Sequence, residues 1–193
     1  MDTPYIKLIE HSQEDSQQAI IFIRGYISEN LDVKIEKNWI NSVRESGFKG
    51  AIYYLWWDSG KSTLGNYIRA NLQWNQVKQR AKKVGQQYLM SLISDLSEKS
   101  ISLIGYSLGC RIIYYGLSTS HNHEKSIDNV ILLGGAVRRN KNWLTVTNQI
   151  KSNLVNIYNS NDKILKVLFK LGNFNTNSPC GLKCIENVNS KIM

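Results

Sequence analysis

Short apolar runs alternate along the chain with longer segments in which apolar residues recur at helical spacing. Five runs stand out, at residues 19–23, 51–57, 101–104, 129–133 and 154–158. Each has the length of a strand and is bounded by polar residues or glycine. Continuous apolar runs are typical of parallel strands that are buried on both faces of a sheet. Residues 5–9 alternate in polarity instead, and they predict a short edge strand.

The segments between these runs predict helices. Apolar residues recur every three or four positions over 31–43, 74–96, 108–117, 143–150 and 164–171. Strand, helix and strand in succession form a crossover unit with parallel strands. We therefore expect an α/β fold, a three-layer sandwich with a mostly parallel doubly wound sheet. Residues 64–71 read as irregular, and residues 184–189 as one final short strand.

The length and composition of the chain are those of a protein with a single hydrophobic core. The 193 residues are 42% hydrophobic and show no internal repeat, so we expect a single domain over residues 1–193. No apolar run approaches the roughly 20 residues of a membrane span, and the first residues lack a secretion signal. These features predict a cytoplasmic location. Cys110 reads as a buried small residue, and Cys180 and Cys184 as free thiols rather than metal ligands.

The charge balance is basic. Lys and Arg number 24 against 15 Asp and Glu, which gives a formal charge of +9 and favours anionic partners. The basic residues are scattered apart from 80–83 and 138–141, so nucleic acid is not expected, and an anionic membrane surface is a second-place candidate. The basic residues of the long helix, Lys78, Arg80, Lys82 and Lys83, read as a solvated face.

Candidate chemistry centres on Gly105–Gly109, which reads G-Y-S-L-G between a strand and a helix. This matches the G-x-S-x-G turn that presents a serine nucleophile at the end of a strand. A purely structural turn remains an alternative. A dinucleotide fingerprint is less favoured, because Ser107 occupies one of its glycine positions. Gly60-Lys61-Ser62 resembles half of a phosphate-binding loop, but Leu55 stands where that loop needs glycine, so nucleotide binding is a third hypothesis.

Four stretches in order resemble the α/β-hydrolase superfamily, serine esterases and lipases in particular. They are residues 20–28, 105–111, 129–136 and 155–162, and the resemblance covers Ala19 to Asn189. It looks like a minimal, α/β-hydrolase-like member without a lid domain. The resemblance implies hydrolysis of a carboxylic ester, with a small molecule or a lipid as the ester, and no cofactor or metal.

The resemblance also implies roles for individual residues. Ser107 is the expected nucleophile and Asp162 the acid that orients a histidine, in the family's chain order. Asp162 could equally cap a helix, and Asp58 and Asp128 are rivals, although Asp128 precedes its strand. Backbone N–H groups of Leu108 and of Tyr26 (or Ile27) are expected to form the oxyanion hole.

The resemblance also implies a histidine base after the last strand, and the sequence does not provide it, because no histidine follows residue 123. His11, His121 and His123 are all expected at the far edge of the sheet, whereas Asn189 and Lys191 are expected near the vacant place. A truncation before the histidine, a histidine from another chain, and loss of catalysis are three explanations. The alternative function is therefore a catalytically inactive binding or regulatory protein with a protein partner.

Overall fold

A computed structural model describes residues 2–26, 33–60, 67–119, 125–171, 178–186 and 190–193. Its six-stranded sheet has the strand order β1-β3-β2-β4-β5-β6. The strands are β1 (Tyr5–Glu10), β2 (Gln18–Ile23), β3 (Ala51–Trp56), β4 (Ser100–Tyr106), β5 (Ser126–Leu133) and β6 (Leu154–Ile157). Edge strand β1 runs antiparallel to β3, and the other neighbours are parallel.

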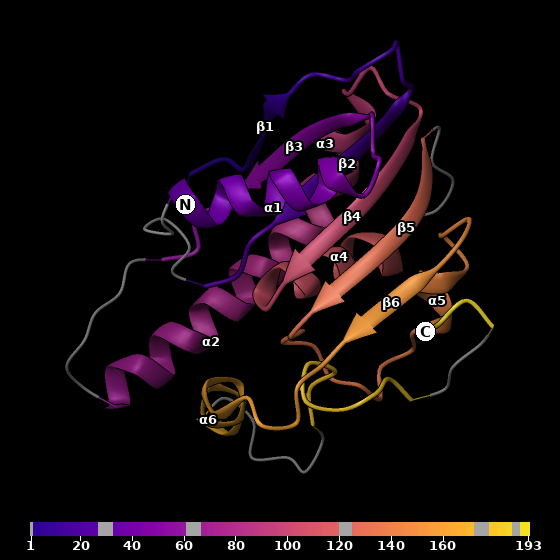
Figure 1. Ribbon diagram of the computed structural model, residues 1–193. Helices are drawn as coiled ribbons and strands as arrows, with labels where there is room; N and C mark the ends of the chain where they lie inside the picture. The colour runs from indigo at the N-terminus through magenta and orange to yellow at the C-terminus, as the bar shows by residue number, and fades with distance from the viewer. Residues whose placement is uncertain (1, 27–32, 61–66, 120–124, 172–177, 187–189) are drawn as a thin grey trace.

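Helices cover both faces of the sheet (Figure 1). They are α1 (Val33–Glu45), α2 (Tyr67–Val84), a π-helical segment η2 (Gly85–Leu89), α3 (Met90–Ser94), α4 (Leu108–Thr119), α5 (Leu144–Thr147) and α6 (Lys163–Leu171). Helix α1 lies in front of the sheet in this view, and α2 and α4 lie behind it. The predicted three-layer, mostly parallel α/β architecture is confirmed.

The parallel strands end level with one another. Ile23 at the end of β2 pairs with Gly105 of β4, and Leu133 of β5 pairs with Tyr106 on one side and Ile157 on the other. The loops that follow β2, β4, β5 and β6 therefore leave the sheet at the same edge, at the bottom of Figure 1. We call this edge the carboxyl rim.

Three sequence predictions about secondary-structure elements are wrong. Residues 67–71 are helical rather than irregular, and the helix expected over 74–96 is interrupted by η2. A Cβ on Gly85 would lie 2.4 Å from the carbonyl oxygen of Ile112, so η2 lies directly against α4. Residues 184–186 are in no strand; instead Ile192 forms a single parallel bridge with Leu154 beside β6.

The expected solvated face of α2 is also wrong in part. Lys78 is only 6% exposed, because α2 packs against α4. Arg80 forms an ion pair with Asp58 at 2.9 Å, and the Lys82 ammonium lies 5.3 Å from the ring centroid of Tyr115. Lys83 is exposed, as expected.

Candidate functional site

Ser107 occupies the turn between β4 and α4. Its φ of 53° lies in the left-handed region, which costs a residue with a side chain about 1–2 kcal/mol. Two backbone hydrogen bonds hold this conformation: the Ser107 amide donates to Leu133 O at 2.9 Å, and the Ala136 amide donates to Ser107 O at 3.0 Å. The strand, turn and helix predicted around this serine are therefore present, and they place it at the carboxyl rim.

Glycines make room for the turn. A Cβ on Gly25 would lie 2.7 Å from Cβ and 3.2 Å from Oγ of Ser107, so the loop after β2 touches the serine directly. A Cβ on Gly109 would lie 1.9 Å from the carbonyl oxygen of Ile23. Only glycine fits at either position, because real Cβ atoms do not approach other heavy atoms so closely. The first turn of α4 and the end of β2 are thus pressed together around Ser107.

The two expected oxyanion donors lie on these same elements. Leu108 is the first residue of α4, where backbone N–H groups lack partners within the helix. Tyr26 follows Gly25, and its ring packs edge-on against Trp74 of α2 with the centroids 5.9 Å apart. Burial raises the pKa of Tyr26. Ile27, the second candidate in this loop, lies outside the described residues.

Asp162 lies after β6, at the start of α6. Its Oδ1 accepts a hydrogen bond from the Leu165 amide at 2.8 Å, which is the helix-capping role considered from the sequence. A series of backbone hydrogen bonds connects Asp162 to the serine turn. The Asp162 amide donates to Asn159 O, and the Asn159 amide donates to Gly181 O. The Gly181 amide donates to Gly135 O, and the amide of the following residue, Ala136, donates to Ser107 O. Asp162 and Ser107 therefore belong to one hydrogen-bonded network of rim loops.

The rival carboxylates are engaged elsewhere. Asp58 receives the Arg80 guanidinium at 2.9 Å and the Gly60 amide at 3.2 Å. Asp128 accepts hydrogen bonds from the hydroxyls of Ser100 and Ser126, which begin β4 and β5. Asp128 thus lies at the edge of the sheet opposite Ser107, as the sequence predicted.

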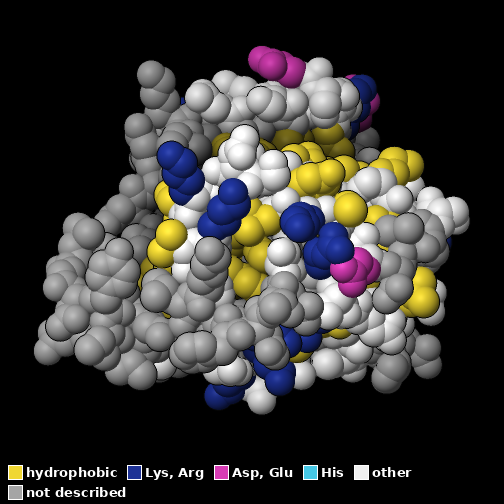
Figure 2. Space-filling model, turned by 90° about the horizontal axis from the view of Figure 1, so that it is seen from below, with side chains coloured by type: hydrophobic (Ala, Val, Ile, Leu, Met, Phe, Trp, Pro, Cys, Tyr) yellow, Lys and Arg dark blue, Asp and Glu magenta, His cyan; other side chains and the backbone are white. Residues whose placement is uncertain are grey.

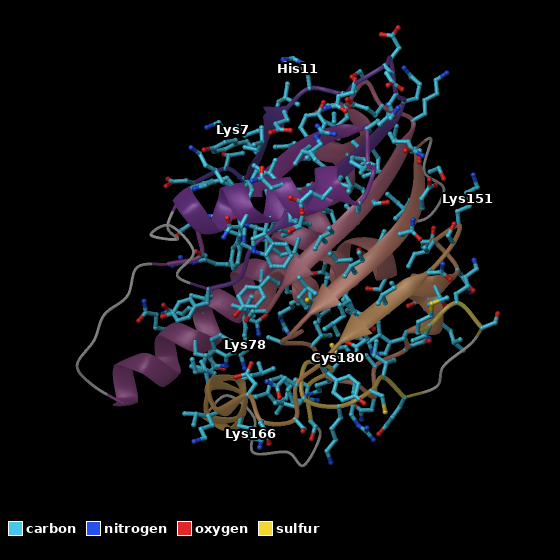
Figure 3. The ribbon with its side chains drawn as sticks, viewed as in Figure 1. Lys7, His11, Lys78, Lys151, Lys166 and Cys180 are labelled. Carbon is cyan, nitrogen blue, oxygen red and sulfur yellow. The ribbon has the colours of Figure 1, made fainter. Side chains whose placement is uncertain are left out.

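His11 also lies at the opposite edge. It follows the last residue of the antiparallel β1, and Figure 3 shows it at the upper end of the sheet, far from the rim. His121, His123 and Asn189 lie outside the described residues. The expectation for Lys191 is wrong: its ammonium donates to Ile150 O at 2.6 Å, and its carbonyl accepts from the amide of Leu154, the first residue of β6. Within the described residues, therefore, no histidine lies at the carboxyl rim.

The cysteines of the rim are structural. Cys110 and Cys180 are buried, and a Cβ on Gly135 would lie 2.6 Å from Cys180 Sγ. Burial raises the pKa of Cys180 to about 12 and that of Cys110 well above its ordinary value, so neither is a reactive thiolate. Across the described ranges, no three His, Cys, Asp or Glu side chains gather where they could hold a metal ion.

An apolar cavity of about 340 Å³ lies between α1 and the sheet. Trp39 of α1 forms one wall, and Phe22 and Ile104 form the sheet wall. Its lining reaches the rim at Tyr106, the residue before Ser107, and at Arg24, whose guanidinium lies 4.2 Å from the ring centroid of Tyr54. The volume falls within the range of small-molecule pockets, roughly 300–1,000 Å³.

A basic cluster that the sequence did not reveal lies behind Ser107. We use the name basic cluster for Lys78 of α2, Arg111 of α4 and Arg138 of the loop after β5. Burial, then Arg111 and Arg138, lower the pKa of Lys78 to about 8. Burial and Arg138 lower the pKa of Arg111, although Tyr115 opposes them. The three cations come from separate parts of the chain, so no local run of basic residues could have indicated the cluster.

Comparison with known proteins identifies a family model and several relatives that match this chain. Residues 23–193 match the model of a family described as "Protein of unknown function (DUF726)". "Uncharacterized membrane protein C6F6.13c" of Schizosaccharomyces pombe is 34% identical over 117 residues, which are 58% of this chain and 15% of that protein. "Probable lipase MIL1" of Saccharomyces cerevisiae is 31% identical over 136 residues, which are 68% of this chain and 12% of that protein.

Among solved structures, a Pyrococcus furiosus esterase is similar with a TM-score of 0.43 and 16% identity, over 86% of this chain and 76% of that one. The chain spans less than a fifth of the length of the curated relatives it matches. The expected cytoplasmic location is wrong as stated, because relatives are named membrane proteins. In the described part of the chain, no helix is both long and apolar enough to span a bilayer.

Proposed function

This chain belongs to the DUF726 family, and from that premise we propose that it is a serine hydrolase of carboxylic esters with Ser107 as the nucleophile. One observation carries the proposal: Ser107 is held in a left-handed conformation at a strand-to-helix turn, against the backbone of Gly25. Backbone strain of this kind persists where the surrounding structure enforces it, and it is concentrated at functional sites.

The rim supplies most parts of an acyl-transfer site. Ser107 Oγ attacks the ester carbonyl, and the N–H groups of Leu108 and Tyr26 stabilise the oxygen that becomes negative. Asp162 orients the imidazole that takes the serine proton. That imidazole is not the side chain of His11, which lies at the opposite edge of the sheet (Figure 3).

A lipid ester is the substrate class we favour. The yeast relative is named a probable lipase, and an apolar cavity reaches the residue before Ser107. An acyl chain in this cavity would contact Phe22, Trp39 and Ile104 and would lose its contact with water. The formal charge of +9 adds attraction to an anionic membrane surface, where such esters are found.

A second candidate is a hydrolase-fold protein that binds a partner without catalysis. It is favoured by the same two observations that limit the first: the described rim carries no histidine, and Asp162 caps α6. The two functions differ in whether the Ser107 hydroxyl can become a nucleophile.

Covalent labelling separates them. The purified chain is incubated with a fluorophosphonate probe, with and without added imidazole as a substitute base, and adducts are located by mass spectrometry. We expect an adduct on Ser107 that imidazole accelerates about tenfold or more, within the range for general bases. Ser107→Ala should carry no adduct, and Ser94→Ala, at an exposed serine in α3, should label normally. A folded chain that stays unlabelled in imidazole would contradict hydrolysis and support the binding protein.

A further inference from the structure

We propose that the carboxyl rim docks onto an anionic phospholipid bilayer, with α6 lying in the headgroup region. We use the name docking face for the side chains that would contact the lipid, which are Ile157 of β6 and Lys163, Ile164, Lys166 and Val167 of α6. Docking would bring lipid esters to the serine turn, and only this connection rests on the proposed function. Binding to the bilayer does not require that the serine reacts.

Exposed apolar side chains gather at the rim. Among the described residues, nine large hydrophobic side chains are exposed, and Ile164 is the most exposed of them at 74%. Five of the nine lie on α6 or at the ends of β4 and β6: Tyr106, Ile157, Tyr158, Ile164 and Val167. Single exposed apolar residues are common on protein surfaces, whereas a group of them marks a place of contact with a protein or a membrane.

The strand register joins this group to the mouth of the apolar cavity. Tyr106 and Ile157 both pair with Leu133, from opposite sides. Paired residues of neighbouring strands point to the same face of a sheet and lie about 5 Å apart, so these three side chains form one row. Tyr106 and Leu133 also line the cavity. The row therefore leads from β6 to the cavity that would hold the acyl chain.

Helix α6 is apolar on more than the side it buries. Leu165 and Phe169 are 4% and 6% exposed, and they anchor the helix to the protein. Ile164 and Val167 are three residues apart and so are neighbours on the helix surface, where they are 74% and 49% exposed. Figure 1 shows α6 below the rim. A helix with apolar side chains beyond its buried face is stabilised by a second apolar environment.

The charges of α6 select an anionic environment. Its sequence, KILKVLFKL, contains three lysines and no acidic residue. Lys163 and Lys166 are exposed, and Figure 3 shows Lys166 at the lower end of the molecule. Lysine side chains keep their ammonium groups at the headgroups while apolar neighbours enter the acyl boundary. Figure 2 looks onto the rim from below and shows Lys and Arg side chains beside hydrophobic ones, with fewer Asp and Glu.

The position of the docking face favours a lipid surface over a protein partner. Helix α6 begins directly after Asp162, and backbone hydrogen bonds connect Asp162 through the rim loops to Ser107. A bilayer in contact with α6 would therefore lie beside the serine turn and could deliver single lipid molecules to it. A rigid protein on the same face would cover the row that leads to the cavity.

Vesicle flotation tests the apolar part of the docking face. Binding is measured with vesicles of phosphatidylglycerol and phosphatidylcholine in equal parts, and with phosphatidylcholine alone. We expect the double variant Ile164→Asn/Val167→Asn to bind the anionic vesicles weaker by about tenfold or more, because it loses apolar area and keeps its charge. The matched control is Leu144→Asn/Met193→Asn, at two exposed apolar positions outside the docking face, and it should change binding by less than about twofold. Circular dichroism verifies that both variants are folded.

A second pair of variants tests the charges. Lys163→Gln/Lys166→Gln should weaken binding to the anionic vesicles by about tenfold or more, because each basic residue close to an anionic surface contributes about fivefold in affinity. Lys7→Gln/Lys151→Gln removes the same charge from exposed positions that Figure 3 shows away from the lower end of the molecule. This control should weaken binding by less than about threefold. An equal loss in both pairs would show attraction by net charge alone and overturn the docking face.

A membrane-embedded probe tests the connection to Ser107. A fluorophosphonate with a long alkyl chain is incorporated into the anionic vesicles, and labelling is followed with imidazole present. We expect Ser107 to be labelled about fivefold or more slowly in Ile164→Asn/Val167→Asn than in the wild type, because the variant is less often at the lipid surface. A short, water-soluble fluorophosphonate should label both proteins at the same rate. Equal rates with the embedded probe would overturn the connection between docking and the serine.

Two further outcomes are decisive. A wild-type chain that binds neither kind of vesicle would overturn the proposal, and dimers that Ile164→Asn/Val167→Asn dissociates in analytical ultracentrifugation would then assign the face to a second copy. If vesicle binding requires the docking face while neither probe ever labels Ser107, the docking stands and the proposed hydrolysis fails.

Discussion

At the scale of single residues, the conformation of Ser107 is the most informative feature. Its φ of 53° is strained for any residue with a Cβ and relaxed for glycine. We therefore expect Ser107→Gly to be more stable than Ser107→Ala by about 1 kcal/mol, even though glycine ordinarily destabilises the folded state through the entropy of the unfolded chain. Urea denaturation of the two variants measures the difference. An alanine variant that equals or exceeds the glycine variant would show that the turn stores no strain.

The sequence predicted this turn because all its determinants are local: an apolar strand, glycines on both sides of the serine, and a helix pattern after it. Lys78 was predicted wrongly for the opposite reason. Its helical neighbours place it on a charged face, and only the packing of α2 against α4 buries it. The local sequence therefore predicted the conformation of the Ser107 turn correctly, but it did not predict the tertiary contact that buries Lys78.

At the scale of elements, a buried hydrogen bond joins β3 to the turn before β4. The Tyr53 hydroxyl lies 3.0 Å from Oε1 and 3.1 Å from Oε2 of Glu98, and both residues are at most 9% exposed. Tyr53→Phe leaves a buried carboxylate without this donor, which costs about 1–3 kcal/mol. We expect a loss of that size in urea denaturation. Tyr88→Phe, at a less buried tyrosine of η2, is the comparison and should change stability by less than about 0.5 kcal/mol.

The strands were predicted closely, and the irregular elements were not. A buried parallel strand is marked by its own apolar run, and the ends of β2, β3 and β6 fall within a residue or two of the predicted ones. The π-helical segment η2 depends on tertiary contact: Gly85 lies against Ile112, and a Cβ on Gly116 would lie 2.4 Å from the Leu89 side chain. No local sequence pattern in residues 74–96 indicates where α4 will contact this segment.

At the scale of the whole molecule, the order of the strands brings distant segments together. Strand β4 lies between β2 and β5, so the loops that carry Gly25, Ser107 and Arg138 meet at one rim. The sequence predicted the rim from alternating strands and helices, because parallel strands expose their carboxyl ends on one side. It could not predict the basic cluster, since that requires the packing of α2 as well as the strand order.

The cluster gives the molecule a pH-dependent stability that Lys78→Met should remove. Burial, and then the charges of Arg111 on α4 and Arg138 in the loop after β5, lower the pKa of Lys78 from 10.5 to about 8. Between these values the unfolded chain binds more protons at this position than the folded chain, so the free energy of unfolding rises with pH across this window. At pH 7 the burial penalty is present in full, and we expect Lys78→Met to be more stable than the wild type by about 2 kcal/mol.

That advantage should shrink as the pH rises from about 8 toward 10.5, because the wild-type lysine then sheds its charge in the folded state. Urea denaturation at pH 7 and pH 9.5, in buffers without phosphate, measures the free energy of unfolding of the variant and of the wild type. The difference between the two proteins is compared at each pH, because the contribution of titrating tyrosines is the same in both and cancels. Lys83→Met, at the exposed neighbouring position, should show no such trend. A Lys78→Met advantage that stays constant with pH would mean that burial and the neighbouring charges do not lower the pKa of Lys78 in the folded protein.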